Sequence, residues 1–474
     1  MSGGGPTAEH FDIVIIGGGP GGYAAALYGG AANLKIAIVE MDKVGGTCLH
    51  RGCIPAKELL ETASVYRTVA GAKEFGVLAD QPGLDFSATM QRKQKVVDQL
   101  WKGLQGLLKQ RKVVTYSGTG TLHAGHLVRV AGGESGDVEL TGDTVILASG
   151  SVPRTIPGFD VDGTTVVTSD ELLSIEKLPS SAVVIGGGAI GCEFASMMAD
   201  LGTQVTVLEA LPKILPGCDD DVTQVVLKSF KKRGIEVRAG VKVTGHTPDP
   251  DGGTSVEFGD GESVKVDLVV VSVGRRPLSE NLGLDGTSVE VDQRGFVVVD
   301  EFCRTAEGGV YAIGDVIATP QLAHVGFAEG IVVIKDVLGE DPVPVDYGRV
   351  PWCIYCHPEV AFAGHSEASA KEAGLDIVTS KHRFVGNGRA LIVGEPDGLV
   401  KIIAVRDPGS GHGGQIVGVH MVGPWVTEQL GQGYLALNWE ATVAEVAHFI
   451  QPHPTMSELF GESVMALTGR GLHG

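Results

Sequence analysis

The chain has 474 residues, of which 43% are hydrophobic and 20% are charged, so it can build several hydrophobic cores and is neither a small disulfide-stapled scaffold nor a disordered chain. Its 57 acidic residues outnumber its 37 basic ones, and the net charge of −20 argues against nucleic acid and anionic membranes as partners. The apolar runs are too short for a membrane span. The seven cysteines are irregularly spaced, and residues 1–11 lack a basic segment followed by an apolar one, so we expect a cytoplasmic protein.

The first predicted element is a buried strand over residues 12–16 that leads directly into a glycine-rich turn. An Ala-rich helix follows the turn, and a second strand over residues 35–39 ends at Glu40. By itself this pattern is a weak indication of a nucleotide site. The glycines of the turn that match GxGxxG are Gly17, Gly19 and Gly22.

Two cysteines, Cys48 and Cys53, come shortly afterwards. On a straight helix their Cα atoms would be separated by a rise of roughly 7.5 Å, which exceeds the ~4.4–6.8 Å that a disulfide tolerates. The two cysteines can therefore pair only if the backbone bends. Gly52 supplies the flexibility for a bend, and Pro55 limits regular helix before it.

The same segment can be interpreted in two ways. Arg51 and Lys57 flank the cysteines with positive charge that would stabilise a thiolate, as a redox-active pair requires. Alternatively, the two cysteines are buried free thiols. The position of the segment directly after a glycine-rich unit favours the redox-active pair.

The arrangement of strand, glycine turn, helix and strand occurs a second time, with strands over residues 182–185 and 204–208 and a helix over residues 192–200. The acidic residue that ends each unit, Glu40 or Glu209, lies 23 positions after the first glycine (40 − 17 and 209 − 186). The second set of glycines is Gly186, Gly188 and Gly191.

This repeat has a specific physical interpretation. In a dinucleotide-binding unit the first glycine permits the tight turn, the second admits a pyrophosphate, and the third lets helix and strand pack closely. The helix N-terminus favours the negative charge of the pyrophosphate, and the acidic side chain accepts a hydrogen bond from a ribose hydroxyl. Glycines that serve only turn geometry are the alternative, and the matched pair of units disfavours it. The sequence therefore predicts two dinucleotide sites.

Other segments indicate packing rather than chemistry. Residues 91–111 are expected to form a helix whose apolar face packs on the core, and the turn clusters at 131–137, 246–254 and 407–415 are expected to be exposed hairpin loops. Plausible chain boundaries fall near 151, 275–277 and 342–349. The apolar residues of the helix face are Val97, Leu100, Trp101, Leu104, Leu107 and Leu108.

Near the C-terminus two groups contain residues that are common in functional sites. Cys353 and Cys356, followed by His357, resemble half a zinc site, but the sequence has no second CxxC pair, so we expect strand packing and no metal. His453 precedes Glu458 by five positions with Pro454 between them, so the carboxylate could orient the imidazole as a general base. Chance proximity of the two side chains is the alternative.

These motifs together resemble the FAD-dependent pyridine-nucleotide disulfide oxidoreductases over about residues 11–467. Three segments carry the resemblance: residues 45–57, which read GGTCLHRGCIPAK; residues 305–315, which end in VYAIGD; and residues 453–458, which read HPTMSE. The resemblance implies an α/β fold with two Rossmann-like dinucleotide-binding domains, for FAD and for an inserted NAD site, and a C-terminal α+β dimerisation domain. It places the FAD domain at 1–151, the NAD domain at 152–277, a central return to the FAD fold at 278–345, and the interface domain at 346–474.

The resemblance also assigns residues to cofactors and to catalysis. It implies a redox-active disulfide between Cys48 and Cys53, with His453 of a partner subunit as the base and Glu458 as its orienting acid. Lys57 would lie at the flavin and pair with Glu193. The residues implied for FAD are Gly17, Gly19, Gly22, Glu40, Lys57, Gly120, Asp315 and Ala323, and those implied for NAD are Gly186, Gly188, Gly191, Glu193, Glu209, Val243 and Gly274.

Within the family the closest resemblance is to members that oxidise protein-bound dihydrolipoyl groups with NAD, as homodimers serving 2-oxo acid dehydrogenase or glycine cleavage complexes. A substrate thiolate would attack Cys48, Cys53 would leave as a thiolate against the flavin, and the electrons would pass through FAD to NAD⁺. The alternatives are an NADPH-dependent reductase of another small disulfide and a non-catalytic flavoprotein scaffold. Three positions near the implied catalytic residues depart from the family pattern, namely His50 in place of Asn, Ala56 in place of Ser or Thr, and Gln451 in place of His. A fourth, Cys356 in place of Thr, affects no implied catalytic residue.

Overall fold

The computed structural model describes residues 8–80, 83–133 and 136–473, which form two compact units. The first unit contains the chain up to residue 58 together with residues 87–154 and 274–347. The second contains residues 59–86, 155–273 and the chain from residue 348 onward. The mixed α/β architecture confirms the predicted fold class, and the four predicted domain ranges stay predictions.

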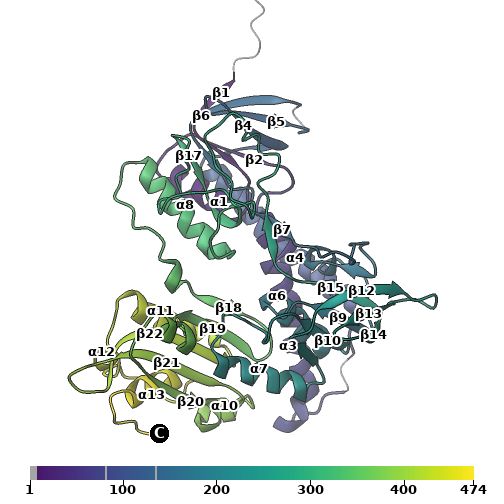
Figure 1. The fold of residues 1–474 in the computed structure, drawn as a ribbon, viewed down its shortest axis with the longest axis vertical. Coiled ribbons are helices and arrows are strands. Elements are labelled where there is room, and N and C mark those ends of the chain that lie inside the picture. Colours follow the sequence, from purple (N-terminus) through teal and green to yellow (C-terminus); the bar gives the residue numbers. More distant parts are fainter. Residues whose placement is uncertain (1–7, 81–82, 134–135, 474) are drawn as a thin grey trace, which may run out of the picture. The chain divides into compact units, whose positions relative to one another are not determined.

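The first unit is built on a seven-stranded sheet with the order β3-β2-β1-β6-β5-β4, in which β17 also pairs with β6. Strands β1, β2, β3, β6 and β17 pair in parallel, whereas β4, β5 and β6 pair antiparallel. Helices α1 and α8 lie side by side in Figure 1 and contact each other. The strands are β1 (Glu9–Ile16), β2 (Ile36–Glu40), β3 (Val114–Ser117), β4 (Thr119–His123), β5 (Leu127–Ala131), β6 (Val138–Leu147), β7 (Ser151–Pro153), β16 (Arg275–Pro277) and β17 (Val310–Ala312).

The central strands of this sheet are apolar because both of their faces are covered, as is usual for parallel sheets. The consecutive residues Ile13, Val14 and Ile15 of β1, which point to alternate faces, have no exposed surface. Short strands β7 and β16 form a separate antiparallel pair. The helices of this part of the chain are α1 (Pro20–Ala31), α2 (Gly46–Arg51), α3 (Cys53–Gly71, of which residues 53–58 belong to the first unit), α4 (Phe86–Gln110) and α8 (Ala323–Val337), with 3₁₀ turns η2 (Gly314–Val316) and η3 (Tyr347–Arg349).

The helix predicted over residues 91–111 corresponds to α4, but its apolar face is narrower than expected. Val97, Leu104 and Leu108 are buried. The prediction is wrong for Leu100 and Leu107, which are 45% and 49% exposed. These two positions flank the buried stripe, and the stripe that a helix buries against one sheet does not extend to its flanks.

The second unit contains three sheets. The first is fully parallel with the order β11-β10-β9-β15-β8, the second is an antiparallel trio β12-β13-β14, and the third is antiparallel with the order β18-β19-β22-β21-β20. The parallel sheet carries the second glycine turn, between β9 and α6. The elements up to residue 271 are η1 (Ala72–Phe75), β8 (Val166–Val167), α5 (Ser169–Leu172), β9 (Ser181–Ile185), α6 (Ala189–Asp200), β10 (Gln204–Glu209), α7 (Asp220–Lys232), β11 (Glu236–Ala239), β12 (Val243–Pro248), β13 (Thr254–Phe258), β14 (Glu262–Val266) and β15 (Leu268–Val271).

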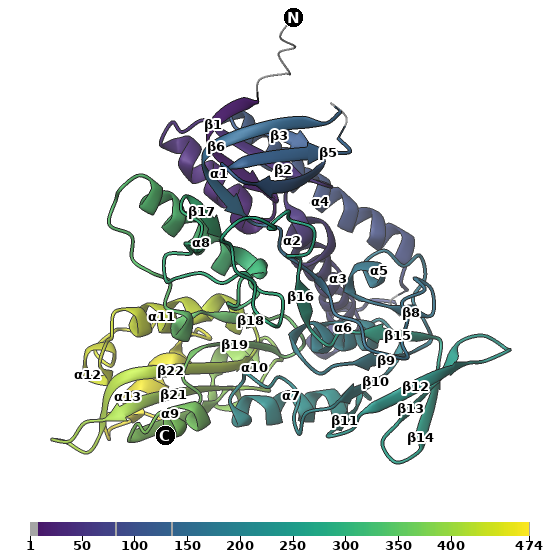
Figure 2. The ribbon, with the colours of Figure 1, turned by 45° about the horizontal axis from the view of Figure 1, so that its top comes forward.

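The C-terminal sheet packs against helices of its own segment (Figure 2). Helix α11 contacts β19 and β22, and α13 contacts β20 and β21. The loops predicted at 246–254 and 407–415 fall in the β12–β13 and β21–β22 hairpins, and part of the loop at 131–137 lies outside the described residues. The elements are β18 (Trp352–Ile354), β19 (Glu359–Gly364), α9 (Glu367–Glu372), β20 (Ile377–Arg383), η4 (Phe384–Gly386), α10 (Gly388–Ile392), β21 (Leu399–Arg406), β22 (Gly413–Gly423), α11 (Val426–Asn438), α12 (Val443–Val446) and α13 (Glu458–Ala466).

Among the described residues, no helix combines the length and the apolar character that crossing a bilayer requires.

Candidate functional site

The first glycine turn joins β1 to α1, and its three glycines have different surroundings. A Cβ added at Gly17 would overlap the carbonyl oxygen of Ala148, and one added at Gly22 would overlap the carbonyl oxygen of Gly17. Gly17 also has a φ of +109°, which residues with side chains rarely adopt. A Cβ at Gly19, in contrast, would have no atom within 4 Å. The turn itself therefore requires the outer glycines, and the middle one faces open space.

The second turn, between β9 and α6, has the same construction. A Cβ at Gly186 would lie 2.5 Å from the carbonyl oxygen of Ser272, and one at Gly191 would overlap the carbonyl oxygen of Gly186. Gly186 has a φ of +106°. A Cβ at Gly188 would again have no atom within 4 Å. The repeat seen in the sequence is thus a repeat of three-dimensional structure.

Both turns fit the pyrophosphate of a dinucleotide. Gly19 and Gly188 are the N-cap residues of α1 and α6, which are 12 residues long each, and neither helix has a side-chain cap or an acidic residue in its first turn. The backbone N–H groups and the positive end of each helix dipole are therefore left for an anion. The open space at the middle glycine is where a pyrophosphate approaches the backbone in such units.

The acidic residue that ends each unit is bonded to its own glycine turn. Glu40 Oε2 accepts the N–H of Gly18 at 2.7 Å, and Glu209 Oε2 accepts the N–H of Gly187 at 2.6 Å. In both cases Oε1 accepts the N–H of the residue two positions further on, at 2.9 and 2.7 Å. The carboxylates thus hold the turns in shape. Because each oxygen can accept a second hydrogen bond, the ribose contact that the sequence predicts stays a prediction.

Cys48 and Cys53 form a disulfide, with their Cα atoms 4.6 Å apart. The bend that this pairing requires occurs at Gly52, whose φ of −147° and ψ of −111° end α2, and α3 begins at Cys53. The backbone behaves as the sequence indicated, and Pro55 lies in the first turn of α3, where a proline is tolerated.

The disulfide segment is attached directly to the first glycine turn. The N–H of Gly45 donates to the carbonyl oxygen of Gly18 at 2.8 Å. A Cβ on Gly46 would lie 2.6 Å from the Cα of Gly19, so the start of α2 touches the middle glycine. Cys48 follows two residues later. The sulfur pair is therefore held beside the turn that fits a dinucleotide.

The positive charge of Arg51, which flanks the cysteines, is partly neutralised by a nearby carboxylate. Arg51 forms an ion pair with Asp42 at 3.2 Å, and both side chains are 44% exposed. Such an exposed pair contributes little to stability, but it reduces the charge that Arg51 offers a thiolate. Sequence reasoning did not find this pair.

Asp315 occupies a partly buried site that the sequence had only partly indicated. Its Oδ2 accepts the Ser151 hydroxyl at 2.6 Å, and that hydroxyl in turn accepts the Nε–H of Arg275 at 2.7 Å. The Arg275 Nε lies 3.9 Å from the same carboxylate oxygen. Burial raises the pKa of Asp315, and the bond from Ser151 and the charge of Arg275 partly oppose the shift. Ser151 and Arg275 are on β7 and β16, which pair with each other, so the sequence could not show that they meet at Asp315.

The remaining predicted cofactor residues are distributed over both units. Gly120 on β4 packs so closely that a Cβ would lie 3.0 Å from Val39, whereas Gly274 has a φ of +103° and open space around it. Ala323 is the first residue of α8, and Val243 is the first residue of β12.

The predicted pairing of Lys57 with Glu193 stays a prediction, because the two residues belong to different units. Glu193 is buried on α6, where its Oε1 accepts the N–H of Tyr355 at 2.9 Å. This bond fixes the segment before the cis His357–Pro358 peptide to the helix that follows the second glycine turn.

His453 and Glu458 meet as predicted. The Nδ1 of His453 lies 2.7 Å from Glu458 Oε1, and Glu458 Oε2 accepts the N–H of Thr455 at 2.7 Å. Because the carboxylate accepts, Nδ1 is the donor, and the opposite ring nitrogen is left to exchange protons. The His453 side chain is 77% exposed, whereas that of Glu458 is 23% exposed. The arrangement can act as an oriented general base on a substrate that comes from solution or from another chain.

The three departures from the family pattern have identifiable surroundings. His50 donates from Nε2 to the carbonyl oxygen of Val44 at 3.0 Å and lies edge-on to Trp101, with ring centroids 5.9 Å apart. Ala56 is buried. Gln451 packs so closely on Gly461 of α13 that a Cβ there would lie 2.5 Å from its Cγ. His50 and Gln451 thus pack within the segments that carry the predicted catalytic residues.

Of the CxxC pair, only Cys353 lies on a strand, as the expected strand packing requires, whereas Cys356 follows the strand. Cys356 is fully buried and contacts the carbonyl oxygen of Pro358 at 3.3 Å, while Cys353 on β18 faces the carbonyl oxygen of Thr427 at 3.8 Å. Burial raises the pKa of Cys356, so it remains a neutral thiol. Within the described ranges, no group of three or more His, Cys, Asp or Glu side chains could hold a metal ion.

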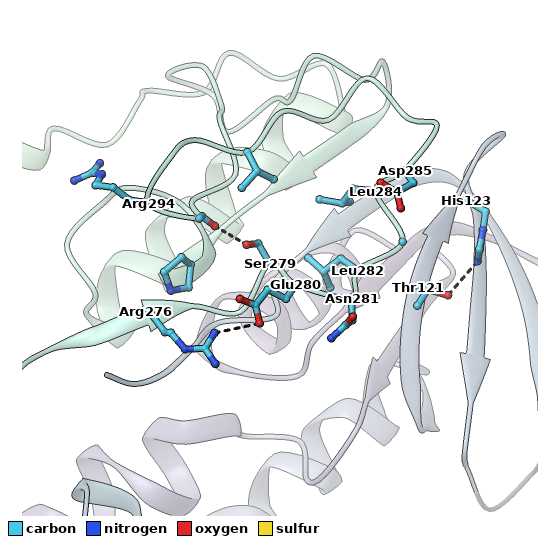
Figure 3. Close-up of a pocket in the computed structure, with 14 residues that line it drawn as sticks. Thr121, His123, Arg276, Ser279, Glu280, Asn281, Leu282, Leu284, Asp285 and Arg294 are labelled. Atoms are coloured by element: carbon cyan, nitrogen blue, oxygen red, sulfur yellow. Dashed lines mark hydrogen bonds and ion pairs between the residues drawn. The ribbon is translucent and has the colours of Figure 1, made fainter. Parts of the chain in front are cut away.

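A surface cavity of about 710 Å³ lies elsewhere in the first unit, between β4 and residues 276–295 (Figure 3). Of its charged side chains, Arg276 is paired with Glu280 at 3.4 Å and Arg294 with Asp292 at 3.3 Å. None of the predicted site residues line it. Because both arginines are paired with nearby carboxylates, they do not indicate an anionic ligand.

Comparison with known proteins gives consistent results. Residues 11–330 match the family model for pyridine nucleotide-disulphide oxidoreductases, and residues 350–464 match the dimerisation domain of that family. The chain is 43% identical to a dihydrolipoyl dehydrogenase of Bacillus subtilis and 39% identical to that of Zymomonas mobilis, over 98% of this chain and 100% of each relative. It also resembles the crystal structure of LpdA from Mycobacterium tuberculosis, with a TM-score of 0.90, 25% identity, and coverage of 97% of this chain and 100% of LpdA. For the flavoprotein disulfide reductase RclA from Escherichia coli the TM-score is 0.86 at 25% identity, over 97% and 100% of the two chains.

Proposed function

Because the chain belongs to the pyridine nucleotide-disulphide oxidoreductases, we propose that it oxidises protein-bound dihydrolipoyl groups with NAD⁺. The observation that carries this proposal is the Cys48–Cys53 disulfide held against the first glycine turn. A disulfide in that position can exchange with a substrate dithiol on one side and serve a bound dinucleotide on the other.

The cofactors of this family are FAD and NAD, and the two glycine turns fit one dinucleotide each. We assign FAD to the first turn, with Glu40, Lys57, Gly120, Asp315 and Ala323. We assign NAD to the second turn, with Glu193, Glu209, Val243 and Gly274. When bound, FAD relays two electrons between a dithiol and the nicotinamide of NAD.

The chain's own residues perform the thiol chemistry. A thiolate of the dihydrolipoyl group attacks the sulfur of Cys48, the Cys48–Cys53 bond breaks, and Cys53 leaves as a thiolate. The second substrate thiolate then attacks the substrate sulfur of this mixed disulfide, which closes the lipoyl ring and releases Cys48. The substrate is oxidised by two electrons, the enzyme disulfide is reduced by two electrons, and two protons leave the substrate.

His453 is the residue that we assign to these protons. Its Nε2 takes the proton of the attacking thiol, while the bond from Nδ1 to Glu458 holds the ring in the tautomer that can accept it. The imidazolium that forms is stabilised by the carboxylate 2.7 Å away. Because a thiol near neutral pH is mostly protonated, this transfer is needed before attack.

The dimerisation domain supports a homodimer. Phe449 and Ile450, which precede His453 closely, are 67% and 96% exposed in the single chain. Large apolar side chains at such exposure favour burial against another surface, by about 1.5–3 kcal/mol each. We propose that this surface belongs to a second copy, and that His453 acts on the disulfide of the other subunit.

The proposed partners are lipoyl domains of 2-oxo acid dehydrogenase or glycine cleavage complexes. NAD is favoured over NADP because Glu209 stands where a 2′-phosphate would need arginine. This makes an NADPH-dependent disulfide reductase the weaker alternative. The presence of the disulfide together with the His453–Glu458 pair argues against a non-catalytic scaffold. Location in the cytoplasm stays a prediction.

The proposal is tested with Cys48→Ser and a control, Cys353→Ser, each assayed with dihydrolipoamide and NAD⁺. Cys48→Ser should lose dihydrolipoamide oxidation and keep its yellow FAD, because the sulfur that accepts the substrate thiolate is gone. Cys353→Ser should retain activity, since Cys353 lies on β18 and is not part of the Cys48–Cys53 disulfide. Full turnover by Cys48→Ser would overturn the assignment.

A further inference from the structure

Glu329 on α8 is a fully buried carboxylate with three hydrogen-bond donors around it. Its Oε2 accepts the backbone N–H of Gly314 at 2.6 Å. Its Oε1 accepts the hydroxyls of Thr319 at 2.8 Å and Tyr347 at 3.0 Å. All of these residues belong to the first unit. The carboxylate therefore ties α8 to the turn that contains Asp315 and to the segment at residue 347.

Burying a carboxylate among uncharged partners costs folding free energy, which suggests that Glu329 has a specific role. Burial raises the pKa of Glu329, and its partners are uncharged donors that oppose the shift only in part. The neighbouring buried residues of α8, Val325, Gly326 and Gly330, are small or apolar, as helix packing requires. A leucine at position 329 would suit such a face without desolvating a charge. The observed bonds thus point to the turn that Glu329 holds.

That turn has a backbone that depends on support. Gly314 has a φ of +72°, and the following residue is Asp315. The orientation of the Asp315 side chain is fixed from one side by Ser151. From the other side, the bond from the N–H of Gly314 to Glu329 fixes the Ile313–Gly314 peptide, at the start of the turn that carries Asp315.

We propose that Glu329 is a positioning residue for FAD: it holds the Gly314–Asp315 turn in the conformation in which the Asp315 carboxylate can receive the hydroxyl groups of the cofactor's ribityl chain. The inference rests on the proposed assignment of Asp315 to FAD and deepens it. Thr319 and Tyr347 complete the support by bonding the second oxygen of Glu329. Glu329 itself touches neither substrate nor cofactor in this account.

The conservative variant Glu329→Gln separates geometry from charge. The Gln oxygen can accept the N–H of Gly314, which cannot reverse its direction. The Gln amide group can then donate to the hydroxyls of Thr319 and Tyr347, because a hydroxyl can accept as well as donate. Glu329→Gln should therefore preserve the turn, whereas Glu329→Ala leaves the buried N–H of Gly314 without a partner.

The test is the dissociation constant of FAD from the full-length protein, measured by fluorescence titration of the apoprotein. Glu329→Ala should weaken FAD binding by about 10–100-fold, the size expected for an unsatisfied buried donor. Glu329→Gln should stay within about threefold of the parent, a rescue that follows from its hydrogen bonds. Glu340→Ala, an exposed glutamate just beyond α8, is the control and should bind FAD normally.

Two further measurements distinguish positioning from other roles. Saturating FAD should restore most of the turnover of Glu329→Ala, since the catalytic groups are unchanged. If Glu329→Ala does not fold, the double variant Thr319→Val, Tyr347→Phe should still show weakened FAD binding of about 3–10-fold. Unchanged FAD affinity in Glu329→Ala, or equal losses in Glu329→Ala and Glu329→Gln, would overturn the inference.

Asp315→Asn shows which proposal has failed. If Asp315→Asn binds FAD normally, the assignment of Asp315 to FAD is wrong, and the role of Glu329 falls with it. If Asp315→Asn binds FAD weakly and Glu329→Ala binds it normally, only the role of Glu329 is wrong.

Discussion

The turns at Gly17–Gly22 and at Gly186–Gly191 have the same backbone construction but different neighbours. In both, the outer glycines are crowded, the middle glycine is open, and a glutamate 23 residues after the first glycine bonds to the turn. At the first turn, however, the next segment returns to touch the middle glycine and carries a disulfide. At the second turn the next segment also returns, and the N–H of Leu215 donates to the carbonyl oxygen of Gly187 at 2.8 Å, but this segment leads to α7 instead of carrying a disulfide.

The support of the two regions also differs. The first lies in the same unit as the partly buried Asp315, whose carboxylate accepts the Ser151 hydroxyl, while Arg275 donates to the hydroxyl and the carbonyl oxygen of Ser151. Beyond the second, the N-terminus of α7 is fixed to β21 by an ionic cluster, in which Lys401 bonds to Asp219, Asp221 and Glu367 at 2.8–2.9 Å. The repeated unit therefore provides a turn that fits a dinucleotide, and the residues packed beside each turn determine which chemistry takes place there.

The largest expected effect is on the thiol reaction alone and should leave nucleotide binding at both turns unchanged. His453→Gln should slow dihydrolipoamide oxidation by roughly 10²–10⁴-fold, because that is the usual contribution of a positioned acid or base. FAD content and the KM for NAD⁺ should change little. Stopped-flow measurement of the thiol half-reaction gives the rate directly.

The second His–Glu pair of the same region provides a matched control for this prediction. His473 lies 3.2 Å from Glu462 and is 79% exposed, closely similar to His453. His473→Gln should leave the half-reaction unchanged. A loss below threefold in His453→Gln, or equal losses in the two variants, would contradict the assigned role.

The ionic support of the second region predicts the next largest effect. Lys401 is 4% exposed and Asp219 is 2% exposed, so Lys401→Met leaves the buried carboxylate of Asp219 without its cation. Removing one partner of such a buried pair costs about 3–5 kcal/mol of unfolding free energy. Thermal unfolding measures this loss, and Lys381→Met is the control variant. Lys381 bonds to Asp221 but is 41% exposed, so its removal should cost at most ~1 kcal/mol of unfolding free energy.

Acidification should reduce the difference between Lys401→Met and the parent. Burial raises the pKa values of Asp219 and Asp221, but their bonds to lysines outweigh it and the net shift is downward. The pKa of Glu367 is lowered by Lys371 and Lys401. Groups with lowered folded-state pKa values stabilise the fold above their unfolded values, about 4 for Asp and Glu, and lose that contribution as the pH falls further. A Tm difference that stays constant from pH 7 to pH 3 would argue against the cluster as its source.

The smallest expected effects come from substituting the middle glycine of each turn, and they test whether both turns bind a dinucleotide in the same way. Gly19→Val and Gly188→Val introduce side chains into space that no protein atom occupies, so both variants should fold. Each should weaken its own dinucleotide by about 1–3 kcal/mol through overlap with the ligand, roughly 5–150-fold. Gly19→Val should release FAD, whereas Gly188→Val should keep FAD and raise the KM for NAD⁺. Loss of the same ligand in both variants would contradict the division of the two sites.

The sequence predicted the elements whose signal is local. Each turn is specified by adjacent glycines, a buried strand and a helix, and the bend between Cys48 and Cys53 follows from Gly52. The apolar positions of α4 were predicted from the helical repeat, but the exposure of Leu100 and Leu107 depends on how much of the helix the sheet covers.

The supporting residues could not be predicted, because their partners are distant in the chain. Ser151 meets Asp315 across 164 positions, and Arg275 reaches Ser151 across 124. Glu329 offered one signal, a charged residue among the small and apolar residues 325–334 of α8, but nothing in the sequence indicated that it faces Gly314. That Glu40 and Glu209 bond to their own glycine turns, besides being the predicted ribose contacts, could likewise not be predicted from the sequence.

A thiol count tests the central claim most directly. The chain has seven cysteines, five of which are free. Titration with a thiol reagent in denaturant should find five thiols per subunit in the oxidised protein and seven after anaerobic reaction with dihydrolipoamide and removal of the excess. Cys48→Ser should give six in both states. A count in the parent protein that dihydrolipoamide does not change would contradict the account, whatever nucleotides the protein binds.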